Sequence, residues 1–217
     1  MRLVLVGPPA SGKGTQAAVL TAVLGVPKIS TGDMLREARV QKTELGLAAE
    51  AFMNAGQLVP DKVVIGLVEE RLDQADAQAG FILDGFPRTV VQATALEALL
   101  NERGTPLDAV VQIDVTRDLL VERATLRRTD KRTGQIYHLK YTPPPPDAEL
   151  VHRIDDQEET VAARLDQYDA MTAALLPHYQ ALGLLRRIDG VGKPEEVTER
   201  MLATLGIDAR GTKLINS

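Results

Sequence analysis

Residues 7–15 read Gly-Pro-Pro-Ala-Ser-Gly-Lys-Gly-Thr and directly follow the apolar run Leu3–Val6. This is the G-x-x-x-x-G-K pattern of a phosphate-binding loop between a buried strand and a helix. The backbone N–H groups of such a loop and of the next helix N-terminus converge on one concavity that binds anions. Gly7 and Gly12 allow the tight turn, and Lys13 adds a positive charge. A glycine-rich turn without a ligand is disfavoured, because the flanking strand and helix match the context that the motif requires.

The end of the motif departs from its usual form. Gly14 stands where the simple pattern has Ser or Thr, and Thr15 carries the nearest hydroxyl. Because Mg²⁺ dehydrates reluctantly, we expect it to be held mainly by nucleotide phosphates and water. The departure also argues against a switch-type GTPase.

Hydrophobic patterning predicts a parallel α/β sheet, since short apolar runs alternate with segments of helical periodicity. The expected strands are Leu3–Val6, Lys28–Ser30, Phe81–Leu83, Ala109–Ile113 and Leu185–Ile188. The expected helices are Lys13–Leu24, one opening at Thr31, Leu45–Ala55, Val63–Leu72, Thr89 to about Arg103, Asp118–Arg127, Asp156 toward Leu182, and Pro194–Leu205. Continuous apolar strands between helices are typical of a sheet covered on both faces.

Several polar residues follow the expected strands directly. Ligands of parallel α/β sheets bind beyond the carboxyl ends of the strands. Lys13, Thr31, Asp84 and Arg88 all lie just past such ends. We therefore expect one crevice to gather them.

Two capping signatures mark helix starts. Thr89 with Gln92, and Asp156 with Glu159, have the three-residue spacing of a capping box. The first pair explains Gln92 by local structure alone. That explanation stays open beside any role of Gln92 in binding.

Two segments break the alternation of strands and helices. Residues 31–60 insert helices without an evident strand, and residues 128–155 are polar and rich in turns. The second segment predicts a short hairpin followed by a stiff stretch at Pro143–Pro146. Long connections in compact domains are often functional lids. The segment after Gly206 is expected to be loosely held.

The charge balance limits the classes of partner. The 217 residues include 25 Lys and Arg against 30 Asp and Glu, a formal net charge of −5, which disfavours general nucleic-acid binding. The absence of cysteine excludes disulfides and cysteine-ligated zinc. No apolar run approaches the ~20 residues of a membrane span, and no leader is recognised. We therefore expect a cytoplasmic protein without membrane or nucleic-acid partners, and a monomer because no heptads are present.

Four motifs occur in order along the chain. They are Gly7–Gln16, Ile-Ser-Thr-Gly-Asp-Met-Leu-Arg at 29–36, Leu-Asp-Gly-Phe-Pro-Arg at 83–88 and Asp-Asp-Gln-Glu-Glu-Thr-Val at 155–161. Together they resemble the adenylate kinase family from Met1 to about Gly206. The resemblance implies a P-loop core with a five-stranded parallel sheet flanked by helices, an AMP-binding arm and a mobile lid. The implied segments are 1–30, 61–125 and 157–217 for the core, 31–60 for the arm and 126–156 for the lid.

The resemblance also implies the reaction and its ligands. The family transfers the γ-phosphoryl group of ATP to AMP reversibly with Mg²⁺, giving two ADP. The implied ATP-binding residues are Ala10, Ser11, Gly12, Lys13, Gly14, Thr15, Arg123, Arg127, Ile136, Tyr137 and Lys193. The implied AMP-binding residues are Thr31, Arg36, Gln57, Leu58, Val59, Gly85, Phe86, Pro87, Arg88, Gln92, Arg153 and Arg164. The implied catalytic residues are Lys13, Asp84, Arg88, Arg123, Arg153 and Arg164.

Such a reaction needs cations more than a base. The acceptor oxygen is already anionic, so catalysis rests on positioning and charge neutralisation. The sequence supplies Lys13, Arg36, Arg88, Arg123, Arg127, Arg153 and Arg164. Arg123 and Arg127, four residues apart on one predicted helix, are expected to share a face, although a solvated basic face is the alternative for Arg127. Asp84 is expected to orient Mg²⁺-bound water, or otherwise to cap the turn at Gly85.

Two further expectations concern the arm and the lid. Thr31 could cap the first arm helix as well as bind AMP. Some long-lid members of the family hold zinc, but here Asp130 and Thr133 occupy that neighbourhood without cysteine. We expect no lid zinc, with hydrogen bonds through these two residues in its place.

Two other functions stay open. A nucleoside monophosphate kinase with another base preference would share the motifs, although Thr31 and Gln92 favour AMP. A regulatory nucleotide-binding module without turnover would need fewer cations than this chain supplies.

Overall fold

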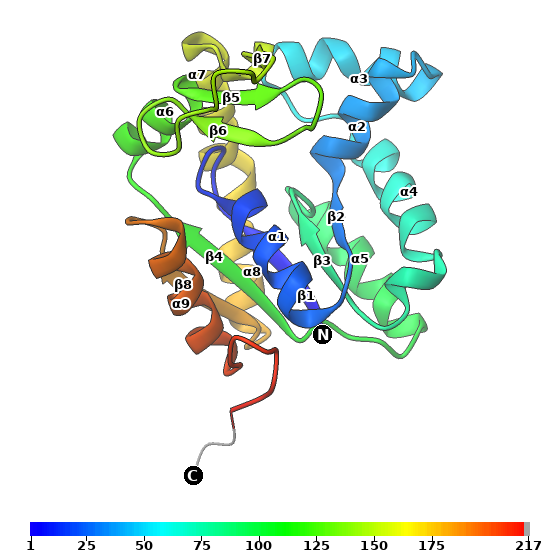
Figure 1. Ribbon diagram of the computed structural model, residues 1–217. Coiled ribbons are helices and arrows are strands. Elements are labelled where there is room, and N and C mark those ends of the chain that lie inside the picture. The colour runs from blue at the N-terminus through cyan, green and yellow to red at the C-terminus, as the bar shows by residue number, and fades with distance from the viewer. Residues whose placement is uncertain (215–217) are drawn as a thin grey trace.

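In the computed structural model, which describes residues 1–214, a five-stranded parallel sheet forms the centre of the fold (Figure 1). Its strand order is β2-β3-β1-β4-β8. The strands are β1 (Arg2–Val6), β2 (Lys28–Ser30), β3 (Phe81–Asp84), β4 (Ala109–Asp114) and β8 (Leu185–Asp189). β1 lies in the middle and pairs in parallel with β3 and β4. The predicted parallel α/β sheet is confirmed.

β1, β3, β4 and β8 contribute side chains to two cores, one on either face of the sheet, whereas β2 contributes Ile29 to the first core alone. In β1, Val4 and Val6 belong to one core, whereas Leu3 and Leu5 belong to the other. Burying each such side chain contributes about 1.5–3 kcal/mol relative to leaving it exposed. This two-sided burial explains why the central strands β1, β3 and β4 read as nearly continuous apolar runs, whereas the edge strand β8 carries the exposed Arg186 and Arg187.

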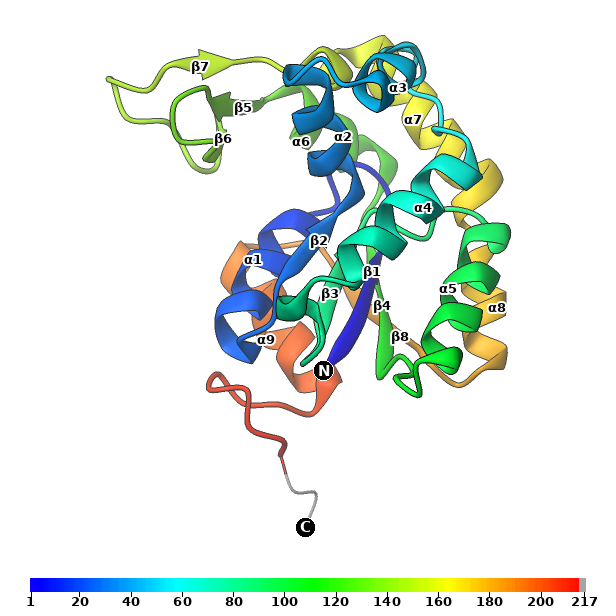
Figure 2. The same ribbon diagram turned by 90° about the vertical axis from the view of Figure 1, so that its right-hand side faces the viewer.

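Helices cover both faces. The first core packs against α4 (Asp61–Leu72), α5 (Val90–Glu102) and α8 (Leu175–Ala181). The second packs against α1 (Lys13–Leu24), α6 (Arg117–Thr125), α7 (Glu158–Gln167) and α9 (Pro194–Leu205). Figure 2 shows α1 and α9 on one side of the sheet and α4, α5 and α8 on the other.

The first insertion is a pair of helices between β2 and α4, namely α2 (Thr31–Val40) and α3 (Glu44–Asn54). The two cross closely at Gly46, where a β-carbon would overlap the backbone of Ala38 and Arg39. Ser30 is the N-cap of α2, since its side chain accepts the Asp33 N–H at 3.3 Å. The prediction that Thr31 could cap this helix is therefore wrong.

The second insertion is a small antiparallel sheet that projects from the core (Figure 2). Within residues 1–214 it has three strands in the order β6-β5-β7. They are β5 (Arg127–Asp130), β6 (Ile136–His138) and β7 (Leu150–Val151). The predicted hairpin is β5–β6. The prediction missed β7, because two residues are too few to show a strand period.

The predicted helix over Asp118–Arg127 is wrong at its end. α6 ends at Thr125, and Arg127 is the first residue of β5, where it pairs with His138. The Leu139 N–H donates to the Leu126 carbonyl at 3.0 Å, so hydrogen bonding to the lid already begins at Leu126, the residue before β5. Arg123 and Arg127 therefore lie on different elements and do not share a helix face.

The predicted capping box at Asp156 is also wrong. Asp156 closes the short 3₁₀ turn η2 (Ile154–Asp156) and is fully buried, while Gln157 is the N-cap of α7. Its carboxylate accepts hydrogen bonds from the Arg127 guanidinium on both oxygens, so its partner lies in the lid and not at the start of α7.

The long helix expected from Asp156 toward Leu182 is interrupted. α7 ends at Gln167, the π-helical turn η3 (Tyr168–Thr172) follows, and α8 begins at Leu175. Pro177 lies in the first turn of α8 and has no N–H to donate to the carbonyl four residues earlier, which disfavours a regular helix continuing from α7 into α8.

Two peripheral segments complete the described chain. A 3₁₀ turn, η1 (Ala75–Ala77), leads from α4 into β3. Ile207 is 2 % exposed and belongs to the second core, so the expectation of a loosely held segment after Gly206 is wrong at that residue. Residues 215–217 of the predicted core segment lie outside the described residues.

Gly46→Ala should destabilise the fold, because the new β-carbon forces α3 away from α2. Overpacking of this kind costs about 1–3 kcal/mol. Gly66→Ala in α4 is the matched control, since a β-carbon there meets no described atom within 4 Å. Alanine should stabilise α4 by about 0.8–1 kcal/mol. Urea unfolding should therefore show the midpoint falling for the first variant and rising for the second; a Gly46→Ala protein as stable as the wild type would contradict the close crossing.

Candidate active site

A cleft of about 1130 Å³ opens at the carboxyl end of the central sheet. Its walls come from the phosphate-binding loop, the end of β3, the lid sheet and the loop before α9. The seven cations singled out from the sequence all line it: Lys13, Arg36, Arg88, Arg123, Arg127, Arg153 and Arg164. The fold therefore concentrates positive charge where α/β sheets bind ligands.

The phosphate-binding loop closes tightly around Lys13. Gly12, the N-cap of α1, has a φ of 97°, a left-handed conformation that favours glycine. A β-carbon at Gly7 would lie 2.8 Å from the Ile113 carbonyl and from Ser11 Oγ. Lys13 Nζ donates to the carbonyls of Gly7 at 2.7 Å and Pro8 at 2.8 Å. The first N–H groups of α1 have no acceptor within the helix, and they lie at the end of this loop.

Burial lowers the pKa of Lys13 to about 8 from its ordinary 10.5. The negative charge of Asp84 opposes this shift, whereas the charges of Arg88 and Arg164 add to it. A bound polyphosphate would favour the charged ammonium and reverse the shift.

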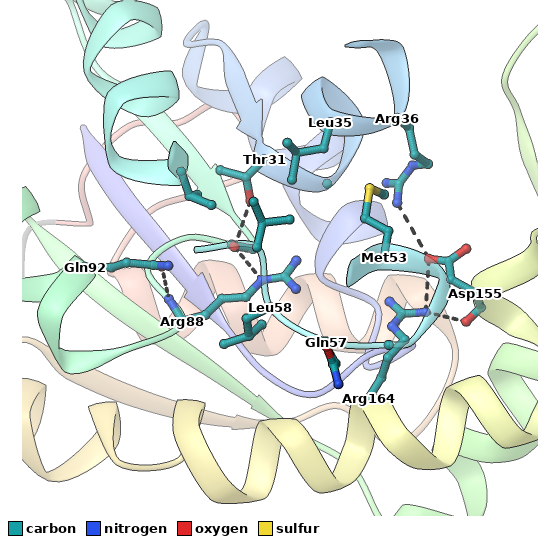
Figure 3. Close-up of a pocket in the computed structure, with 15 residues that line it drawn as sticks. Thr31, Leu35, Arg36, Met53, Gln57, Leu58, Arg88, Gln92, Asp155 and Arg164 are labelled. Atoms are coloured by element: carbon teal, nitrogen blue, oxygen red, sulfur yellow. Dashed lines mark hydrogen bonds and ion pairs between the residues drawn. The ribbon is translucent and has the colours of Figure 1, made fainter. Parts of the chain in front are cut away.

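A second, smaller cavity of about 60 Å³ adjoins the cleft between the α2–α3 arm and the end of β3 (Figure 3). Thr31 Oγ1 and Arg88 Nε both donate to the Gly85 carbonyl, at 2.9 and 2.7 Å. Gly85 has a φ of 78°, and a β-carbon there would lie 2.9 Å from Arg88 Nη2. This glycine therefore leaves the room in which Arg88 lies.

Asp155 joins the arm to the lid return. Arg164 Nη1 donates to the Asp155 carbonyl at 2.7 Å and lies 3.2 Å from its carboxylate, and Arg36 lies 3.8 Å from the same carboxylate (Figure 3). Burial alone would raise the pKa of Asp155, but Arg164 and Arg36 outweigh it and lower that pKa. In the sequence Asp155 is only the first residue of the motif at 155–161, and no local pattern indicates its two arginine partners.

Asp156 anchors a second arginine. Arg127 Nε donates to its Oδ2 at 2.8 Å, and Arg127 Nη2 donates to its Oδ1. Burial would lower the pKa of Arg127, but the hydrogen bond and charge of Asp156 outweigh it and raise that pKa. The pair thus holds the guanidinium in a fixed place at the start of the lid.

For two other arginines, nearby carboxylates do not fully offset the effect of burial on the pKa. It lowers the pKa of Arg164 to about 10 despite the opposing charge of Asp155. It also lowers the pKa of Arg153 to about 10, and the charges of Arg36 and Arg127 add to that shift. Arg153 Nε donates to the neutral Thr129 hydroxyl at 3.0 Å. Both guanidiniums stay cationic at neutral pH and favour an anion beside them.

The family model for adenylate kinase matches residues 5–184. A protein named adenylate kinase from Sorangium cellulosum is 59 % identical over 214 residues, covering 97 % of this chain and 99 % of its own length. The chain belongs to the adenylate kinase family. A second adenylate kinase, from Moorella thermoacetica, is 54 % identical over 197 residues, covering 88 % of this chain and 91 % of its own. Membership makes the chain a nucleotide-binding phosphotransferase.

Most of the residues expected from the sequence to contact AMP surround the small cavity. Nine of them line it: Thr31, Arg36, Gln57, Leu58, Val59, Gly85, Arg88, Gln92 and Arg164. Pro87 and Arg153 line the large cleft instead. Phe86 is 1 % exposed and belongs to the first core, so its side chain is not presented to either cavity.

The residues implied as ATP contacts line the large cleft. They are Ala10, Ser11, Gly12, Lys13, Gly14, Thr15, Arg123, Arg127, Ile136, Tyr137 and Lys193. Arg123 Nη2 donates to the Gly190 carbonyl at 3.1 Å, which places it against the loop before α9. The Lys193 N–H already donates to Glu196 Oε2 at 3.0 Å.

Three aromatic residues of the cleft had no role in the sequence prediction of the site, namely His138, Tyr141 and Tyr168. His138 and Tyr141 stack with ring centroids 4.5 Å apart. Tyr141 lies outside β6, and its place is set by the turn that brings the Lys140 and Tyr141 N–H groups to His138 Nδ1 and by its hydroxyl, which donates to Glu122 Oε1 at 2.6 Å. No periodic signal in the sequence marks it.

Asp84 is the carboxylate beside the phosphate-binding loop. It lines the cleft, and a β-carbon at Gly14 would lie 3.6 Å from its Oδ2. Carboxylate oxygens and water suit Mg²⁺, so the donors at this point fit that ion when it is carried by a nucleotide.

Hydrogen bonds through Asp130 and Thr133 hold the turn between β5 and β6 of the lid. Asp130 Oδ1 accepts the N–H groups of Arg132 at 2.8 Å and Thr133 at 3.2 Å, and Thr133 Oγ1 accepts the Gln135 N–H at 3.2 Å. Residues 1–214 contain no cluster of three or more His, Asp or Glu side chains placed to hold a metal ion. Across the same residues, no helix has the length and apolar character needed to cross a membrane.

Nucleotide binding should take up protons above neutral pH. With a pKa lowered to about 8, free Lys13 loses its proton within the range just above neutral pH. A polyphosphate raises that pKa, so binding near pH 8 should take up a fraction of a proton, and affinity should fall as pH rises further. Calorimetric titration of Mg-ATP in buffers of different ionisation enthalpy measures this uptake. Lys13→Arg, which stays protonated, should abolish it; equal uptake by this variant would exclude Lys13 as its source.

Asp156→Ala should unfold more easily by about 3–5 kcal/mol, because it removes the fully buried partner of the Arg127 guanidinium, which is itself only 18 % exposed. Asp76→Ala is the control, since Asp76 also accepts two bonds from one arginine, Arg71, but at the surface. Its effect should be much smaller. Urea unfolding monitored by circular dichroism compares the two, and equal losses of stability would contradict the anchoring role of Asp156.

Proposed function

We propose that this member of the adenylate kinase family transfers the γ-phosphoryl group of ATP to AMP, forming two ADP. The supporting observation is that two cavities share one cationic junction. Arg36, Arg88 and Arg164 line both the large cleft and the small cavity. A phosphoryl group that passes from a nucleotide in one to a nucleotide in the other would lie among these guanidiniums.

The large cleft is the proposed ATP site. The N–H groups at the start of α1 and Lys13 would bind the β- and γ-phosphates, as helix N-termini and loop amides bind anions. Arg123 and Arg127 approach from different elements and would bind the same phosphates from the lid side. Ile136 and Tyr137 would pack on the adenosine, and the backbone at Lys193 would contact its base.

The small cavity is the proposed AMP site. Arg88 and Arg36 would bind the AMP phosphate, since a planar guanidinium grips two phosphate oxygens at once. Thr31 and residues 57–59 would surround the nucleoside, with Gln92 reading the adenine edge. The backbone of residues 85–88 would complete the phosphate contacts.

Catalysis would rest on charge neutralisation and positioning. The AMP oxygen is anionic before it attacks, so no side chain has to remove a proton. Arg153 and Arg164 would stabilise the charge that spreads over the migrating group, and their lowered pKa values reflect burial without full compensation. Mg²⁺, held by nucleotide phosphates and by water that Asp84 orients, supplies further neutralisation of the phosphate charge.

The two insertions would exclude water. We propose that residues 31–60 and 126–156 move relative to the core segments 1–30, 61–125 and 157–217. Water is a competing acceptor, so closure over both nucleotides would prevent hydrolysis and complete the arginine cluster. A monomeric enzyme in the cytoplasm remains the expectation for its assembly and location.

Phosphorus NMR with Mg-ATP and one acceptor at a time tests the reaction. ADP should form rapidly with AMP and far more slowly with CMP, UMP or GMP. Lys13→Met should lower kcat/KM for AMP by at least about 10²–10³-fold, as loss of a buried charge contact to the transferring phosphates does. Lys62→Met, at an exposed lysine of α4, is the matched control. Comparable turnover with all four acceptors would overturn the assignment of AMP.

A further inference from the structure

Gln92 lies in a ring of hydrogen bonds behind the small cavity. Its Oε1 accepts the Arg88 N–H at 2.7 Å, and its Nε2 donates to Asp61 Oδ1 at 2.8 Å. Thr89 Oγ1 donates to the same Asp61 oxygen at 3.1 Å and accepts the Gln92 N–H at 3.2 Å. Figure 3 draws the contact between Gln92 and Arg88. The expected capping box is thus altered, since Gln92 bonds back to Arg88 and not to Thr89.

This ring determines which way the Gln92 amide points. A backbone N–H can only donate, and a carboxylate can only accept. In the opposite orientation Nε2 would face the Arg88 N–H and Oε1 would face the Asp61 carboxylate. Both contacts would then be repulsive in a side chain that is only 1 % exposed. Asp61 and the Arg88 backbone therefore select the same orientation.

The fixed amide presents a directional pattern to the cavity. Oε1 has a second lone pair, and Nε2 has a second N–H, so each can make one more hydrogen bond. Gln92 lines the small cavity, whereas Asp61, at the start of α4, contacts the amide from outside that lining. A base fits when it offers a donor to Oε1 beside an acceptor for Nε2. Adenine offers this pair, and a 6-oxopurine offers the reverse.

We propose that Asp61 is a positioning residue that sets the base preference of the acceptor site by locking the Gln92 amide against a 6-oxopurine. This inference rests on the proposed function, because it takes the small cavity as the acceptor-nucleotide site. Without Asp61 only the Arg88 N–H opposes the reversed amide. The hydrogen bond from Gln92 to the charged Asp61 then no longer favours adenine over a 6-oxopurine. Loss of such a bond corresponds to a change of about 10- to 100-fold in the preference between the two bases.

The test compares AMP with IMP, which differ at the 6-position and at N1. Asp61→Asn keeps the shape, but its amide can pair with Gln92 in either orientation. The ratio of the dissociation constants, IMP over AMP, should fall about 10- to 100-fold in this variant. Calorimetry measures AMP directly and IMP by competition with AMP. Asp61→Ala should show a fall of the same order.

A matched control separates positioning from a structural tie between α4 and α5. Asp73→Asn removes the ion pair between Asp73 and Arg103 (2.6 Å) at the other ends of the same helices. It should leave the ratio at the wild-type value. If Asp61→Asn weakens AMP and IMP by the same factor, or changes neither, the inference is overturned.

Gln92→Ala distinguishes the two levels of failure. If this variant keeps the wild-type ratio, Gln92 does not read the base, and the proposed reading of AMP fails together with the inference. If Gln92→Ala collapses the ratio and Asp61→Asn preserves it, base reading stands and only the role of Asp61 is overturned. Thermal melting of every variant confirms that the folded protein is compared.

Discussion

Mutual repulsion among like charges is the constraint that shapes this site. Nine lysine and arginine side chains line one partly enclosed cleft, where their repulsion is stronger than it would be in water. The lowered pKa values of Lys13, Arg153 and Arg164 show the cost of their burial. Asp84, Asp155 and Asp156 offset part of this cost. These three carboxylates lie among the cations of the cleft, and their negative charges allow the fold to keep so many positive side chains together.

The two neighbouring aspartates both lie near Arg164, at 3.2 Å for Asp155 and 3.6 Å for Asp156, but they differ in their other partners. Asp156 is fully buried and holds Arg127, so it belongs to the permanent structure. Asp155 lies between Arg36 of the arm and Arg164 of α7, at 3.8 and 3.2 Å. A phosphate that bound these arginines would compete with Asp155, which links anion binding to the contact between the arm and the core.

The sequence predicted the core elements well and the insertions less well. The bounds of α1 and α9 agree with the predicted Lys13–Leu24 and Pro194–Leu205, because local glycine and proline signals mark both helices. Arg127 was placed on a helix, although it begins β5. Lid pairing with His138, which local periodicity does not report, takes Arg127 out of the helix. Asp156 was assigned to a cap for the same reason, since its true partner lies 29 residues away.

By itself the sequence determined the phosphate-binding loop, the parallel sheet and the family, because these follow from residue spacing over short stretches. Only the tertiary structure decided which carboxylate accompanies which cation, and that the Gln92 amide points one way. Asp61 is 31 residues from Gln92 and meets it only because α4 packs beside α5. Hydrogen-bond direction depends on such packing, and a linear pattern of residue types carries no record of it.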